Sequence, residues 1–168
     1  MKEKTFIFAC LLMLSPYVVQ ADNPPTAEEK AFAVNVADTL QERIFALLLN
    51  EFANTSAENF AAGEVAISLV FNDDNRNFRL VGTLEPLRSN DVPQDDFEVD
   101  ALAEAMLGKS TEGVYKVNDR YYFRRSVPLN NFDPSCAICH QNYASPADNA
   151  YVGALMLQVP VVSGNARQ

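Results

Sequence analysis

Apolar side chains recur every three or four positions over residues 27–52, and polar side chains occupy the positions between them. This spacing predicts one long amphipathic helix. Thr26 and Glu29 have the spacing of a capping box, so we expect the helix to begin at about Ala27. The apolar stripe is wide enough to dock on the rest of the domain, which we favour. It also suits pairing with a second copy, so a homodimer is the alternative.

The remaining apolar segments are short. Residues 65–71 are apolar and partly β-branched, which fits either a strand or a buried helix. Asn118 and Asp119 are turn residues between two strand-like runs and predict a β-hairpin. In all, strands are predicted at residues 78–84, 114–117, 121–127 and 152–161.

A second helix is predicted over residues 97–107. Asp95 or Asp96 would cap its first turn, and Gly108 would end it. Two helices among hairpin-linked strands predict an α+β domain with an antiparallel sheet.

The first 21 residues have the pattern of a secretory signal peptide. Lysines precede an apolar run over residues 6–14 that is too short to cross a bilayer, and small residues precede a cleavage point after Ala21. Cys10 lies in this run and would be removed with it. We expect residues 22–168 to form a single periplasmic domain with no membrane span after cleavage. An uncleaved anchor is the alternative.

Residues 136–140 read Cys-Ala-Ile-Cys-His, the C-x-x-C-H spacing of covalent haem c attachment. Cys136 and Cys139 can each bond the same porphyrin edge, and the adjacent imidazole of His140 can ligate the iron as the proximal ligand. His140 is the single histidine of the chain, so no other imidazole can complete the coordination. The motif therefore predicts one covalently bound haem c.

Three other sites share parts of this motif. A thioredoxin-like redox pair requires a βαβ context, whereas here a loop precedes Cys136. A disulfide between Cys136 and Cys139 would close a very short loop and stabilise little. A zinc site would need a fourth ligand, which the spacing does not provide. Export also favours haem, because haem c is generally assembled outside the cytoplasm.

The charge restricts the partners. The formal net charge is −9, and haem propionates would make it more negative. Nucleic acid and anionic membrane surfaces are therefore unfavourable partners, whereas a basic protein is compatible.

Several segments together carry a family resemblance. They are residues 121–129, 136–140 and 151–160, and more loosely residues 87–93, Glu98, Leu102 and the Ala66–Ile67 pair. In these segments the chain resembles the single-haem c-type PAS-like domains, a family that includes a cyanobacterial c-type haem protein of unknown function. Similar domains are the extracytoplasmic sensing parts of bacterial chemoreceptors and kinases. The resemblance implies a PAS-like antiparallel sheet, a long N-terminal helix, a C-terminal haem-attachment loop and a role in redox or ligand sensing.

One departure from the family concerns the distal iron ligand. Members can carry a cysteine near the position of Val70, but residues 22–168 contain no thiol beyond the motif. Met106 and Met156 are weak candidates, because methionine at such positions is usually packing. We therefore expect an open or water-bound iron. Val70 and Phe71 would line an apolar distal pocket that admits a diatomic gas such as nitric oxide or carbon monoxide.

Arg88, Arg124 and Arg125 are candidates for pairing with the propionates, with simple solvation as the alternative for each. No second histidine is present to serve as a distal acid–base group, so we do not expect an enzyme. The expected function is a redox-sensing or gas-sensing module that passes its signal to an unknown redox or signalling protein. The alternative is an electron-transfer cytochrome c with a six-coordinate haem.

Overall fold

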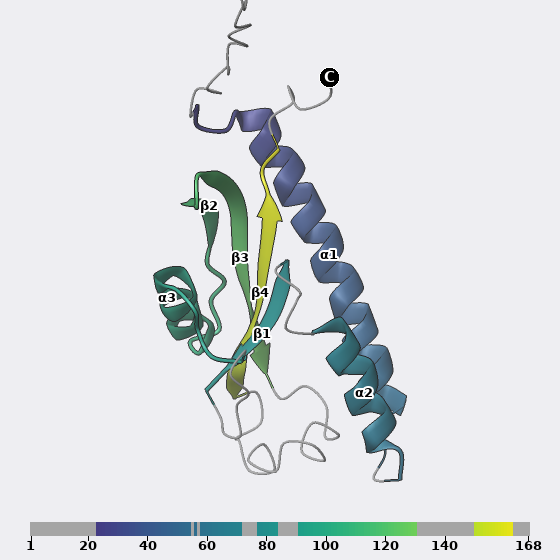
Figure 1. The fold of residues 1–168 in the computed structure, drawn as a ribbon. Coiled ribbons are helices and arrows are strands. Elements are labelled where there is room, and N and C mark those ends of the chain that lie inside the picture. Colours follow the sequence, from purple (N-terminus) through teal and green to yellow (C-terminus); the bar gives the residue numbers. More distant parts are fainter. Residues whose placement is uncertain are drawn as a thin grey trace, which may run out of the picture.

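The computed structural model describes residues 23–54, 56, 58–71, 77–83, 91–130 and 150–162. These residues form a four-stranded antiparallel sheet in the order β1-β4-β3-β2, with helices on both faces (Figure 1). The α+β, PAS-like fold predicted above is thus confirmed. The elements are α1 (Ala27–Asn54), α2 (Phe60–Val70), β1 (Phe78–Gly82), α3 (Asp96–Ala105), β2 (Glu112–Val117), β3 (Arg120–Asn130) and β4 (Tyr151–Pro160).

Helix α1 begins with the predicted capping box. The backbone N–H of Thr26 donates to Glu29 Oε2 at 2.8 Å, and the N–H of Glu29 donates to Thr26 Oγ1 at 3.2 Å. These bonds satisfy donors that the first helical turn cannot use internally. The residues of α1 that are buried against the sheet and α2 are Ala33, Ala37, Ile44 and Leu48. In the described part of the chain, no helix combines the length and the apolar character that a bilayer crossing requires.

The segment whose structure the sequence left open is helical. Helix α2 covers Phe60–Val70, and Ile67 and Val70 pack against the cluster formed by α1 and the sheet. A short apolar run can form its backbone hydrogen bonds in either a helix or a strand. The elements that pack against it decide which of the two it adopts. Here α1 and the sheet already supply an apolar surface.

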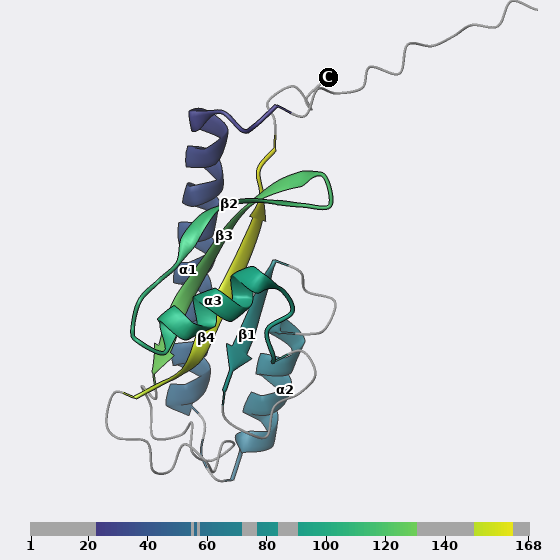
Figure 2. The same cartoon turned by 90° about the vertical axis from the view of Figure 1, so that its left-hand side faces the viewer.

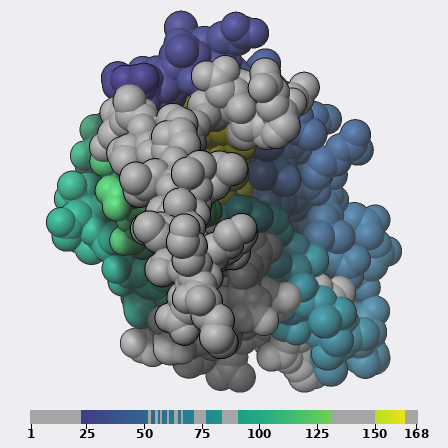
Figure 3. All heavy atoms as spheres, turned by 45° about the horizontal axis from the view of Figure 1, so that its top comes forward, coloured from purple at the N-terminus to yellow at the C-terminus, as the bar shows by residue number. Residues whose placement is uncertain are grey.

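The central strand β4 is buried on both faces. Leu155 and Leu157 point toward α1 and α2, whereas Ala154 and Met156 point toward α3. Figure 2 shows α3 lying across one face of the sheet with α1 behind the other. Figure 3 shows the same arrangement from another side, with α1 and α2 opposite the part that contains α3 and the hairpin. The domain therefore has three layers.

The turns also follow the sequence. Asn118 and Asp119 have φ values of 48° and 63°, the left-handed pair that a two-residue hairpin turn requires. Asp95 is the N-cap of α3, because its carboxylate accepts a bond from the N–H of Glu98 at 3.0 Å. The helix ends at Ala105, earlier than predicted, and a turn leads to Gly108, whose φ is 77°.

Gly153 in β4 offers a test of the packing between β1 and β4. A Cβ at this position would clash with the carbonyl oxygen of Val81, a backbone atom that is held by the sheet. We expect Gly153→Ala to lower the free energy of unfolding by about 1–3 kcal/mol, measured by urea denaturation. The control is Gly113→Ala, whose Cβ would lie 3.0 Å from the half-exposed Tyr115 ring, which can move. Equal effects of the two variants would contradict the prediction.

Candidate functional site

The C-x-x-C-H motif lies outside the described residues, and so does Arg88. What the structure shows is where the connection that carries the motif starts and ends. Strand β3 ends at Asn130 and β4 begins at Tyr151, and these two residues are paired. The connection therefore leaves and re-enters the sheet at the same end, which lies at the bottom of Figure 1. Covalent attachment at Cys136 and Cys139 and ligation by His140 stay predictions.

The sheet is apolar on its α1 and α2 face near this end. Leu129 is the residue before the end of β3, and Leu80 and Leu155 lie on the neighbouring strands in the same cluster. A porphyrin is a large apolar ring, and apolar surroundings favour its binding. Two thiols with an adjacent imidazole form a complete attachment set. The donor set fits a c-type haem.

Val70 and Phe71 lie together at the end of α2. Both belong to the apolar cluster between α1, α2 and the sheet. Phe71 is buried, and its ring packs edge-on against that of Phe78 with 5.5 Å between the ring centroids. Both residues therefore contribute to the apolar core, and a distal pocket at this position stays a prediction.

Helix α2 has a second apolar face that the sequence analysis did not single out. Val65 is 58% exposed and Leu69 is 71% exposed. The helix sequence FAAGEVAISLV contains one charged residue, Glu64. Exposed apolar side chains on neighbouring turns of a helix are suited to contact with an apolar group such as a porphyrin. The signal was present in the sequence as the near-absence of polar residues.

Arg124 lies on the α3 face of the sheet and is buried. Its Nη1 donates to Asp95 Oδ2 at 2.7 Å, its Nη2 lies 3.6 Å from Glu98 Oε1, and its guanidinium stacks 4.3 Å above the Phe97 ring. Arg79 holds the other side of Glu98, with its Nη1 3.2 Å and 3.0 Å from the two carboxylate oxygens. Alternation along β3 could indicate which face Arg124 occupies, but no local signal in the sequence identified this network.

The network also affects the charge of Asp95. Burial of the Asp95 carboxyl acts to raise its pKa. The hydrogen bonds from Arg124 and from the Glu98 N–H, together with the charges of Arg124 and Arg79, lower the pKa by more than burial raises it. The pKa of Asp95 therefore lies below its usual value. The N-cap of α3 is consequently ionised at neutral pH, which also suits the positive end of the helix dipole.

Arg125 faces the opposite side of the sheet, as neighbouring strand residues must. It donates to Asp38 of α1 at 2.6 Å and to Glu112 of β2 at 2.7 Å. Burial acts to lower the pKa of Arg125, and hydrogen bonds to the two carboxylates raise it above its ordinary value. Arg124 and Arg125 thus have carboxylate partners on different faces and do not converge on one site. Their pairing with propionates stays a prediction that would require exchange of these partners.

The two methionines lie in the core beneath α3. Met156 is buried among Phe97, Ala101 and other residues, and Met106 packs against the same cluster. The sulfur of Met106 also accepts a hydrogen bond from Thr83 Oγ1 at 3.9 Å. Both side chains therefore have packing roles in the described part of the chain, which is the role that the sequence analysis favoured.

Comparison with known proteins identifies a family. A model of the Tll0287-like family matches residues 28–156. The matched range runs from the first turn of α1 into β4 and includes the C-x-x-C-H motif. This is the single-haem c-type family that the strands around the motif resemble. No curated protein matches the chain significantly.

Proposed function

Because the chain belongs to the Tll0287-like family of single-haem c-type domains, we propose that it is a periplasmic module that senses redox state or a small gas through one covalent haem. The single observation that carries the proposal is the C-x-x-C-H motif in a connection anchored at one end of a PAS-like sheet. The proposed location follows from the signal-peptide pattern of residues 1–21, together with the extracytoplasmic assembly of haem c.

Cys136 and Cys139 would hold the porphyrin through thioether bonds, and His140 would ligate the iron. A haem held there would supply a reversible one-electron change and a binding position for a small ligand. The pairing of Asn130 with Tyr151 keeps the two ends of the connection together. The segment that contains His140 therefore starts and ends at the same end of the sheet.

The proposed sixth position is open or occupied by water. Both methionine sulfurs of the mature chain lie in the core beneath α3, and residues 22–168 contain no thiol outside the motif. Val70 and Phe71 would present an apolar surface, which favours an uncharged diatomic gas over a charged ligand. A peroxidase is disfavoured because the single histidine is assigned to the proximal side, leaving no imidazole for acid–base catalysis.

The test is an optical spectrum of the haem-loaded protein, oxidised and reduced, with and without carbon monoxide. We expect a high-spin ferrous spectrum that shifts at once when carbon monoxide is added. Met106→Leu and Met156→Leu serve as matched variants and should leave the spectrum unchanged. A low-spin spectrum that does not respond to carbon monoxide would overturn the open site. It would favour the alternative, an electron-transfer cytochrome with a side chain on the iron.

A further inference from the structure

The outer face of α3 combines exposed apolar and exposed acidic side chains. Val99 is 55% exposed, and Leu107, in the turn that follows the helix, is 67% exposed. Residues four apart on a helix lie on one face. The sequence therefore places two adjacent stripes on this helix. The apolar stripe is Val99 and Ala103, with the exposed Leu107 in the turn just beyond the helix, and the acidic stripe is Asp96, Asp100 and Glu104.

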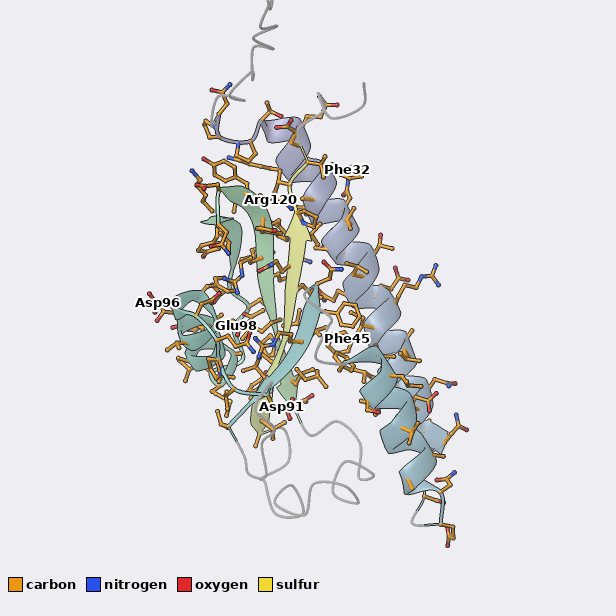
Figure 4. The ribbon with its side chains drawn as sticks, viewed as in Figure 1. Phe32, Phe45, Asp91, Asp96, Glu98 and Arg120 are labelled. Carbon is orange, nitrogen blue, oxygen red and sulfur yellow. The ribbon has the colours of Figure 1, made fainter. Side chains whose placement is uncertain are left out.

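The side chains of the two stripes do not pack against the sheet. The face of α3 that packs on the sheet consists of other residues, including Phe97, Ala101 and the ion-paired Glu98. Figure 4 shows Asp96 on the side of α3 that points away from the sheet, and Glu98 on the side toward it. Among the described residues, Asp96 and Asp100 form no ion pair, and Glu104 pairs with Lys109 at 3.2 Å on the surface.

This face lies close to the base of the predicted haem connection. Gly108, directly after Leu107, is in close contact with Tyr151, since a Cβ on Gly108 would lie only 2.6 Å from the Tyr151 hydroxyl oxygen. Tyr151 is the first residue of β4, immediately after the connection that carries the motif. A protein bound to α3 would therefore lie next to one anchor of that connection.

We propose that the outer face of α3 is the docking surface for a protein that presents basic residues around an apolar patch. Transient interfaces combine an apolar centre, which loses its water, with charged surroundings that steer the encounter. The acidic stripe repels an anionic membrane, and pairing two copies through this face would oppose like charges. The docking surface itself is inferred from α3 alone. Only the signal that the contact would pass on rests on the proposed function.

The experiment measures binding of the haem-loaded protein to a basic monohaem cytochrome c at low ionic strength. Asp96→Asn combined with Asp100→Asn should weaken binding by roughly threefold to tenfold. The charge-matched control is Glu28→Gln with Glu42→Gln on exposed positions of α1, which should change binding little. Val99→Ser with Leu107→Ser leaves the charge unchanged and should also weaken binding.

Three outcomes would overturn the proposal: no binding by the wild-type protein, equal weakening by the two charge variants, or a dimer of this chain that Val99→Ser with Leu107→Ser abolishes. The carbon monoxide response of each variant separates this proposal from the proposed function. A variant that loses binding but keeps a normal carbon monoxide response would support the docking surface and leave the proposed function unchanged. A low-spin haem with binding intact would remove the gas-sensing role and leave the docking surface.

Discussion

Replacing Cys136 and Cys139 with serine is expected to abolish covalently bound haem. Serine cannot form the thioether bonds, and residues 22–168 contain no other thiol to replace them. The measurement is haem retention on a denaturing gel, with the mass of the intact chain as a second readout. The expected mass of the variant is that of the polypeptide alone, whereas the mass of the wild-type chain includes one porphyrin.

The matched control is Cys10→Ser, which removes a thiol from the predicted signal peptide. It should leave haem attachment unchanged, and the mature chain should begin after Ala21. Retention of haem on a denaturing gel by the Cys136 and Cys139 double variant would show that the motif is not the attachment site. A disulfide or zinc site would then be the better interpretation.

The second large effect is expected at Glu98. This carboxylate is 4% exposed and lies between Arg79 and Arg124, and it also accepts a bond from the backbone N–H of Gln94 at 2.8 Å. Removing it would take from Arg79 the carboxylate that binds its Nη1, and would leave Arg124 paired with Asp95 alone among the carboxylates of the described residues. Loss of one member of a buried ion pair typically costs about 3–5 kcal/mol. We expect Glu98→Ala to lower the free energy of unfolding by about that amount.

Urea denaturation of the haem-loaded protein measures this effect. Glu104→Ala is the control, because the Glu104–Lys109 pair lies on the surface and exposed pairs contribute about 0–1 kcal/mol. A loss at Glu98 no larger than the loss at Glu104 would mean that water enters the network and replaces the carboxylate. Combining Glu98→Ala with Arg124→Met should recover part of the lost stability, since the unpaired charge is then removed as well.

Local patterns predicted most of the fold. The capping box at Thr26 and Glu29, the cap at Asp95 and the turn at Asn118 and Asp119 were all confirmed. Each of these signals acts through hydrogen bonds or backbone angles within a few residues. A sequence contains such short-range information in full, and α3 and β1 each end two residues before the predicted boundary, at Ala105 and Gly82.

Whether residues 65–71 form a helix or a strand could not be predicted in the same way. A short apolar run has no period that separates helix from strand, and the surface offered by α1 and the sheet decides in favour of α2. The carboxylate partners of Arg124 and Arg125 could not be predicted for a related reason. Arg124 and Asp95 are distant in sequence, and so are Arg125 and Asp38.

The sequence by itself supports the prediction of a haem attachment site, because the attachment set is a contiguous motif that keeps its spacing in any fold. The sequence also identified the family, and its apolar patterns gave the order in which the strands follow one another along the chain. Only the tertiary structure decided which end of the sheet anchors the motif, which face each arginine occupies, and that α3 leaves an acidic and apolar surface uncovered. These features depend on contacts between segments far apart in the chain, which local patterns do not encode.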